Sequence, residues 1–157
     1  MEQGGELVNR KIDKTGITMV EILVVIAIIA LITAAAIPVY NKARVRALIV
    51  RTKTTINAIE AALSMYTTDF GDYPAFDGTE TKLLVGLLQG PVDSNLWKGP
   101  YMRFKEKDLD ENGNILDAWS TPLYYKYPQD DKTNVPYLII SAGIDRKLQT
   151  EDDIGNW

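Results

Sequence analysis

The sequence predicts an α+β protein in which one long N-terminal helix packs on a small antiparallel β-sheet. Two observations lead to this fold class. The stretch from Ile22 to Val39 is almost wholly apolar, and apolar residues at helical spacing follow it. The C-terminal half is instead polar, rich in tyrosine and interrupted by glycine and proline. With 157 residues, the chain has room for about one domain.

Composition excludes several classes of function. The formal net charge of −4 argues against a nucleic-acid binder held by phosphate attraction. Cysteine and histidine are absent, which excludes disulfides, thiol nucleophiles, Cys/His zinc sites and histidine general bases. Local positive charge gathers at Lys42, Arg44, Arg46, Arg51 and Lys53, and we interpret this run as a solvated helix face.

The N-terminal region joins a basic segment to an apolar one. Residues 1–16 are polar and carry three Lys or Arg side chains. From Ile17 to Ile37 the chain is long enough, as a helix, to cross a bilayer core of about 30 Å. A secreted monomer cut after Ala36 is an alternative. A plain membrane anchor is another alternative, but it does not explain the presence of a charged residue, Glu21, in the apolar segment.

Glu21 is the informative residue of this segment. A carboxylate in a membrane span costs about 2.5–3.5 kcal/mol at the bilayer centre and less toward the interface, so it needs a cationic partner. No Lys or Arg follows Glu21 within several helical turns. A free amine would exist if the chain were cut after Gly16, which would leave Ile17 as the new N-terminus.

The basic leader, Gly16, Ile17 and Glu21, followed by a long apolar run, resemble the cleavage signal of type IV pilins and type II secretion pseudopilins. The resemblance implies that a prepilin peptidase cuts after Gly16 and that the amine of Ile17 is then methylated. It also implies that Glu21 pairs with the amine of a neighbouring subunit during assembly. Pro38 falls where this family often has a proline, and we expect a weak point of the helix there. Counting Lys and Arg would place the C-terminal side in the cytoplasm, whereas the resemblance places it outside.

The helix is expected to continue well beyond the apolar segment, from about Ile17 to Thr68. Its second half should present one apolar face, because apolar residues recur there at steps of three, four and seven. They are Val45, Leu48, Ile49, Ile56, Ile59, Leu63, Tyr66 and Phe70. Gly71 and Pro74 should end the helix. The string from Tyr66 to Pro74 resembles the helix exit of pseudopilins.

The remaining residues predict a small head domain that contains both a helix and β-strands. Thr81 to Gln89 reads as a short helix, and Leu123–Tyr127 and Tyr137–Ser141 read as strands because they are rich in aromatic and β-branched residues. The stretch that begins at Asp117 resembles a pseudopilin motif containing Asp, Trp, Gly, Pro and Tyr. Ser120 stands where that motif has glycine, so the form of this turn is left open.

An acidic C-terminal stretch is the candidate metal site. Asp145, Asp152 and Asp153 could close one loop around calcium, which binds six to eight oxygen atoms. The alternative is a solvated acidic loop with Arg146 and Lys147 as counter-charges. The stretch resembles the calcium loop of the major pseudopilin, and that resemblance implies the three aspartates as side-chain ligands.

A second acidic string, from Asp108 to Asn114, matches only the first half of an EF-hand loop. Its twelfth position is Trp119 rather than glutamate, and Asn112-Gly113 is a strong turn signal, so we expect a turn. Asp69, Asp72, Asp108 and Asp110 could in principle supply a catalytic carboxylate pair, but turns and solvated loops explain them better.

The chain therefore most resembles the major, G-type pseudopilins of the general secretion pathway. The expected parts are a leader (1–16), a transmembrane and filament-core helix (17–38), an amphipathic helix half (39–70) and a periplasmic head with a calcium loop (71–157). The resemblance implies a non-enzymatic subunit of a homopolymeric fibre that drives export of folded proteins. Its partners would be minor pseudopilins, a prepilin peptidase and an assembly platform in the inner membrane, with no nucleic acid. A type IV pilus subunit and, more distantly, a membrane-anchored enzyme are the alternatives.

Overall fold

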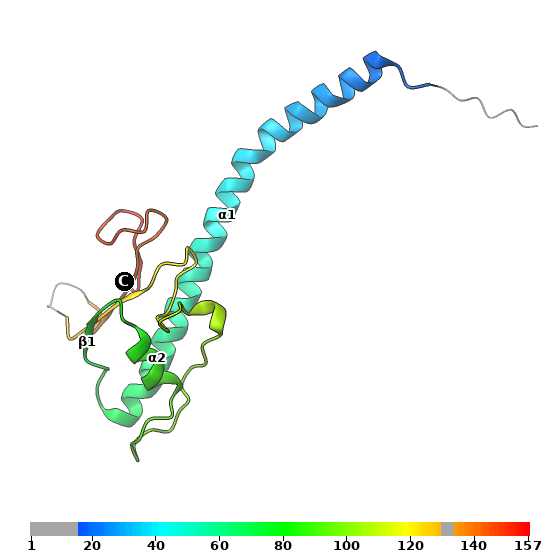
Figure 1. Cartoon of the computed structure of the whole chain (residues 1–157). Coiled ribbons are helices and arrows are strands. Elements are labelled where there is room, and N and C mark those ends of the chain that lie inside the picture. The colour runs from blue at the N-terminus through cyan, green and yellow to red at the C-terminus, as the bar shows by residue number, and fades with distance from the viewer. Residues whose placement is uncertain (1–15, 130–133) are drawn as a thin grey trace, which may run out of the picture. The chain divides into compact units, whose positions relative to one another are not determined.

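The computed structural model describes residues 16–129 and 134–157, so most of the expected leader lies outside the described residues (Figure 1). It confirms the α+β prediction. The chain divides into two compact units, one ending at Asn41 and the other spanning Lys42–Trp157. The elements are α1 (Met19–Phe70), β1 (Phe76–Gly78), α2 (Lys82–Gln89), a 3-10 turn (Glu106–Asp108), β2 (Tyr124–Tyr127), β3 (Leu138–Ser141) and β4 (Ile154–Gly155).

The first unit contains the start of α1. This helix begins at Met19, two residues later than expected, because Thr18 acts as its cap. The Thr18 hydroxyl oxygen accepts the N–H of Glu21 at 3.2 Å and so satisfies one of the free donors of the first turn. Pro38 lies inside the helix and does not end it.

The second unit contains the amphipathic half of α1. Ile56, Ile59, Leu63 and Tyr66 of the predicted apolar face are buried, which confirms the helical spacing. The helix stops at Phe70, where Gly71 takes a φ of 82° and donates its N–H to the Thr67 carbonyl at 2.8 Å. Glycine adopts this left-handed conformation without a steric penalty.

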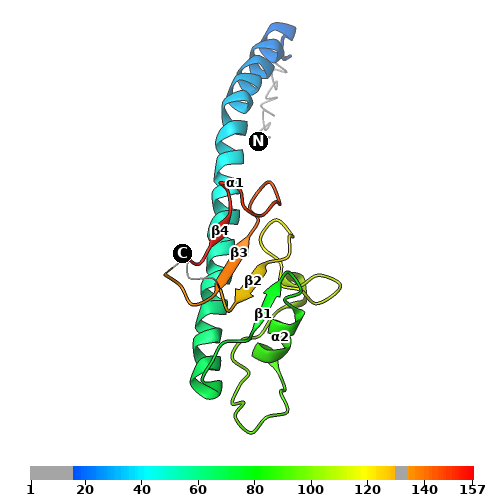
Figure 2. The same ribbon diagram turned by 90° about the vertical axis from the view of Figure 1, so that its left-hand side faces the viewer.

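A four-stranded antiparallel sheet forms the rest of the second unit, in the order β1-β2-β3-β4. Figure 2 shows the strands side by side, with β4 nearest to α1 and β1 farthest from it. The register pairs Phe76 with Tyr127, Tyr125 with Ile139, and Ser141 with Ile154. The two central strands coincide with the predicted ones to within one residue, whereas the short outer strands were not predicted.

One hydrophobic core joins α1, α2 and the sheet. Its buried side chains are Ile56, Ile59, Ala62, Leu63, Tyr66, Leu84, Leu88, Ile115, Leu123, Tyr125, Tyr137, Ile139 and Ile154. Aromatic rings extend this core at the C-terminal end of α1, where Tyr66 stacks on Phe70 with ring centroids 4.3 Å apart. The predicted helix after Thr81 contributes Leu84 and Leu88 to this core.

Candidate functional site

The predicted processing site lies just outside the helix. Gly16, Ile17 and Thr18 precede Met19 and are exposed in a stretch without regular structure. A peptidase must bind its substrate in an extended form, so a helical peptide bond would first have to unwind. The bond between Gly16 and Ile17 lies outside the helix and needs no such unwinding.

Glu21 occupies the first turn of α1 and is exposed. The partial positive charge of a helix N-terminus favours a carboxylate there. Across the described residues, no Lys or Arg side chain forms an ion pair with Glu21. Its counter-charge, if the segment enters an apolar environment, must come from outside this part of the chain.

An uncovered apolar surface follows Glu21. The helix is long and apolar enough to cross a membrane. Its most apolar stretch of 18 residues has a mean hydropathy of 3.0, and none of these residues is buried. The large apolar side chains of this stretch, such as Leu31 at 74% and Val39 at 68%, are exposed. Pro38 cannot donate a hydrogen bond to the Ala34 carbonyl, so the backbone is weakened at the end of this segment. Such a surface requires lipid or other helices around it.

The acidic C-terminal loop connects β3 to β4. The backbone N–H of Asp145 donates to Asp152 Oδ2 at 3.0 Å, and this bond leads the interactions that hold the pKa of Asp152 below its usual value. The Thr150 hydroxyl donates to Asp152 Oδ1 at 2.8 Å and lies 3.4 Å from Asp145 Oδ1. The Gln149 N–H donates to Asp153 Oδ2 at 2.7 Å. The three predicted ligands thus share one hydrogen-bonded loop.

Two features of this loop bear on calcium. Asp153 Oδ1 is buried and has no hydrogen-bond partner within the described residues. A buried carboxylate oxygen without a donor is costly, and a cation would satisfy it. Gly143 has a φ of 61°, and a Cβ there would lie 2.3 Å from the Asp152 carbonyl oxygen, so the loop closes only with glycine at this position. The oxygen atoms of this loop are of the kind that calcium binds.

The carboxylates do not form a finished metal cluster. In residues 16–129 and 134–157, no three acidic side chains come together closely enough to hold an ion. Asp145, Asp152 and Asp153 are instead linked through backbone N–H groups and Thr150. Calcium binding would have to exchange some of these bonds for metal ligation.

A buried carboxylate organises the turn before β2. Asp117 is 5% exposed. Its Oδ1 accepts the N–H groups of Trp119 and Thr121, both at 2.8 Å, and its Oδ2 accepts the Ser141 hydroxyl at 2.6 Å. Ser120 is held at a φ of 63°, the left-handed conformation that glycine adopts most easily. The turn therefore keeps a glycine-like backbone with serine at its tip.

Two buried threonines join this region to the helices. Thr52 of α1 is fully buried, and its hydroxyl oxygen accepts the Ala118 N–H at 3.2 Å. The Thr81 hydroxyl oxygen accepts the Ile115 N–H at 2.7 Å. Sequence reasoning missed both residues. For Thr52 a signal existed, because a polar residue interrupts the apolar face of α1 between Ile49 and Ile56.

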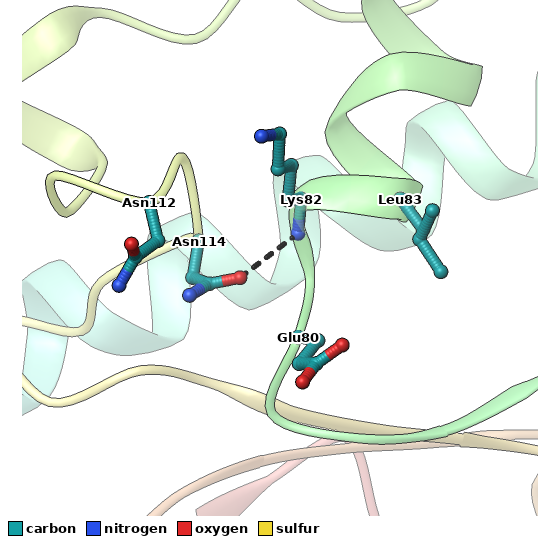
Figure 3. A pocket seen from close by; sticks show the side chains of 5 residues that line it. All are labelled: Glu80, Lys82, Leu83, Asn112 and Asn114. Atoms are coloured by element: carbon teal, nitrogen blue, oxygen red, sulfur yellow. Dashed lines mark hydrogen bonds between the residues drawn. The ribbon is translucent and has the colours of Figure 1, made fainter.

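The string from Asp108 to Asn114 folds as the expected turn. Asp110 Oδ1 accepts the N–H groups of Asn112 and Asn114 at 2.9 and 2.7 Å. Figure 3 shows the Asn114 side chain reaching the backbone N–H of Lys82, a bond of 3.2 Å, in a hollow of about 370 Å³ that Glu80 also lines. The Asn114 amide donates to Asp110, and this bond leads those that lower the Asp110 pKa.

The four aspartates considered as a catalytic pair have separate partners. Asp69 accepts the Tyr101 hydroxyl at 2.7 Å, and Asp72 accepts the Tyr127 hydroxyl. Asp108 forms a 3.0 Å ion pair with Arg51 of α1, and Asp110 holds the turn described above. Each carboxylate is thus explained by its own structural contact.

Comparison with known proteins gives consistent matches. The family model described as type II secretion system, protein G, matches residues 40–157. The chain is 31% identical to the type II secretion system core protein G of Pseudomonas aeruginosa, over 92% of this chain and 96% of that protein. It is also 31% identical to the protein of the same name from Escherichia coli K12, over 94% of each chain. A crystal structure of the major pseudopilin of enterohaemorrhagic E. coli aligns with a TM-score of 0.48 and 26% identity, over 74% of this chain and 87% of that one.

Proposed function

The chain belongs to the protein G family of the type II secretion system, and we propose that it is the major pseudopilin, the structural subunit of that system's fibre. Two observations carry the assembly mechanism: the apolar part of α1 that follows Glu21 is exposed, and Glu21 has no ion-pair partner in the described residues. The proposal assigns the chain a mechanical role and no reaction of its own.

Processing is the first step of the proposal. A prepilin peptidase cuts between Gly16 and Ile17 and methylates the new amine. The exposed, non-helical backbone at this bond supports the assignment. The cut leaves an ammonium group four residues before Glu21, at the same end of the apolar helix.

Membrane storage is the second step. The segment from Met19 to Val39 spans about 30 Å as a helix, which matches a bilayer core. Before assembly it anchors the subunit in the inner membrane, and the head lies in the periplasm. In the fibre, the helices of neighbouring copies replace the lipid around the same apolar surface.

Assembly is the third step. Glu21 of one subunit pairs with the Ile17 amine of the next, so each buried charge gains a partner as a subunit enters the fibre. This pairing disfavours a wrong axial register, because a misplaced copy would leave a carboxylate unpaired in an apolar core. Pro38 provides a point where the helix adjusts to packing against its neighbours.

Calcium holds the C-terminal loop of the head in this proposal, with Asp145, Asp152 and Asp153 as side-chain ligands. The buried, unpaired Asp153 Oδ1 supports the assignment. Minor pseudopilins and the inner-membrane assembly platform are the further partners that the family implies. The growing fibre would push folded proteins across the outer membrane.

Mass spectrometry tests the processing step. The full chain is coexpressed with a prepilin peptidase and extracted from membranes. We expect a mature form that begins at Ile17 and carries one added methyl group, and Gly16→Ala should remain uncut. An uncut wild-type chain, or a start near Ile37, would contradict the processing step.

Electron microscopy of fibres tests the role of Glu21. Glu21→Gln keeps the shape and removes the charge, and it should give processed subunits that do not polymerise. Glu60→Gln is the matched control, because it removes one charge from the same helix and keeps an acceptor for the Asn156 amide 3.4 Å away. Fibres of normal length and number from Glu21→Gln would refute the charge-pairing mechanism.

Thermal melting tests the calcium site on residues 42–157, which form a compact unit. Calcium should raise the melting temperature relative to a chelator, because it binds the folded form alone. Asp153→Ala should abolish that increase, while Glu151→Ala, an exposed acid of the same loop, should keep it. Equal melting temperatures with calcium and with chelator would rule the site out.

A further inference from the structure

Positive charge is concentrated in one short part of α1. Lys42, Arg44, Arg46, Arg51 and Lys53 lie between Glu21 and Glu60, and no acidic residue lies between those two positions. The chain as a whole has a net charge of −4. The basic run is therefore a local feature, which the proposed function does not use.

The first three of these cations lie close behind the apolar segment. Lys42 follows Val39 by three residues, and Arg46 follows it by seven. At 1.5 Å per residue they lie about 5 to 10 Å farther along the helix, which is comparable to the Debye length of about 8 Å at physiological salt. Lys53 lies about 20 Å along the helix from Val39 and is beyond that range.

These three side chains are also available. Lys42, Arg44 and Arg46 are exposed, and no hydrogen bond or ion pair involves them in the described part of the chain. Arg51 differs, because it forms the 3.0 Å ion pair with Asp108. The head therefore uses the later cation and leaves the earlier three free for a partner.

Their arrangement around the helix favours lipid over a protein partner. At 100° per residue, Lys42 and Arg46 share one side of α1, while Arg44 points to nearly the opposite side. A partner helix or an acidic protein surface would contact one side. Lipid headgroups surround a single membrane-spanning helix on every side, and they would meet all three cations. Long Lys and Arg side chains can also bend toward phosphate groups.

We infer that Lys42, Arg44 and Arg46 bind the phosphate groups of anionic phospholipids at the membrane surface where the apolar segment ends, an inference that rests on the membrane insertion proposed above. We call these three residues the headgroup belt. The belt holds the stored subunit at a fixed depth, with the carboxylates of the head kept out of the headgroup layer. The positive-inside rule disfavours Lys and Arg on the non-cytoplasmic side of a membrane helix, and lipid binding explains why three of them lie there.

Lipid selectivity of the full chain tests the belt. The protein is reconstituted in phosphatidylcholine vesicles with trace spin-labelled phosphatidylglycerol or spin-labelled phosphatidylcholine, and the protein-bound fraction of each label is measured by electron paramagnetic resonance. The wild type should prefer phosphatidylglycerol, by up to about fivefold per cation at low salt. The triple variant Lys42→Gln, Arg44→Gln, Arg46→Gln should lose this preference. Replacing chloride by inorganic phosphate at equal ionic strength should leave it unchanged.

A head variant serves as the matched control. Arg103→Gln, Lys105→Gln and Lys107→Gln together remove the same charge from exposed positions of the second unit and should keep the preference. A preference that survives the belt substitutions, or that both triple variants lose equally, overturns the inference. Loss of fibres with unchanged lipid preference in the belt variant would instead assign the cations to an acidic protein partner. Alkaline carbonate extraction separates the two proposals: an extracted chain refutes membrane insertion as well, whereas an inserted chain without preference refutes the belt alone.

Discussion

Replacing Asp117 by alanine should strongly destabilise the head. The carboxylate accepts three hydrogen bonds, from the N–H groups of Trp119 and Thr121 and from the Ser141 hydroxyl. Hydrogen bonds to a charged group contribute about 1.5–3 kcal/mol each, but water can reach the half-buried amides once the side chain is gone. The buried Ser141 hydroxyl gains no such relief. We therefore expect a loss of about 3–4 kcal/mol in the free energy of unfolding.

Asp117→Asn should cost less, about 1–2 kcal/mol, because its oxygen still accepts both backbone N–H groups while its amide turns a donor toward Ser141. Asp93→Ala removes an exposed carboxylate and should change stability by less than about 0.5 kcal/mol.

Urea denaturation of residues 42–157, followed by tryptophan fluorescence, measures these differences. The alanine variant should also melt about 10–20 °C lower than the wild type. A loss below about 1 kcal/mol for Asp117→Ala would refute the assignment of this carboxylate as the organiser of the turn. Equal losses for alanine and asparagine would refute the claim that the shared acceptor oxygen carries most of the effect.

Three further predictions concern the same unit. Ser120→Gly should stabilise it by about 0.5–1 kcal/mol in urea denaturation, since relief of the left-handed strain slightly exceeds the entropy that glycine adds to the unfolded chain; a less stable variant would contradict this. The pKa of Asp69 is lowered, chiefly by the hydrogen bond from Tyr101, so its contribution to stability is complete above its unfolded pKa near 4 and is lost as pH falls through its lower folded pKa. Asp69→Asn should therefore flatten the acid limb of a plot of unfolding free energy against pH, and an unchanged limb would oppose this reasoning. Gly143→Ala should lower the melting temperature in chelator by more than a surface substitution does and reduce the calcium effect, because its Cβ would overlap the Asp152 carbonyl oxygen; an unaltered melting curve would argue against the tight loop.

The long helix was predictable because its signals are dense and local. An apolar run up to Val39 and an apolar stripe that includes Ile56, Ile59 and Leu63 predict one helix with two surroundings. The structure moves the start from Ile17 to Met19, since Thr18 caps the first turn. The two central strands were predictable for the same reason, because each carries its own aromatic and β-branched pattern.

The outer strands were not predictable. Phe76–Gly78 and Ile154–Gly155 are three and two residues long, too short to show an alternation of their own. They form strands because each pairs with a central strand: Phe76 pairs with Tyr127 of β2, and Ile154 pairs with Ser141 of β3. Such pairing is a property of the folded sheet rather than of the segment.

The candidate site divides in the same way. Gly16, Ile17 and Glu21 were found from the apolar run and from the resemblance to pilin-type cleavage signals, and their roles stay predictions that the processing and assembly experiments test. The calcium ligands also stay a prediction. The buried network around Asp117 went unrecognised, because Ser141, which bonds Asp117, and Thr52, which bonds the Ala118 N–H, come from distant parts of the sequence. Only the fold brings them together.

The turn held by Asp117 has a consequence for how such sequences diverge. The hydrogen bonds of the buried Asp117 carboxylate fix the backbone conformation of this turn, so the residue at its tip, position 120, does not have to fix it. Position 120 is then open to drift between glycine and serine, and a change there is a poor sign that a relative has altered its architecture. A change at position 117 would be the one to notice, since no other side chain in that segment takes over its anchoring role.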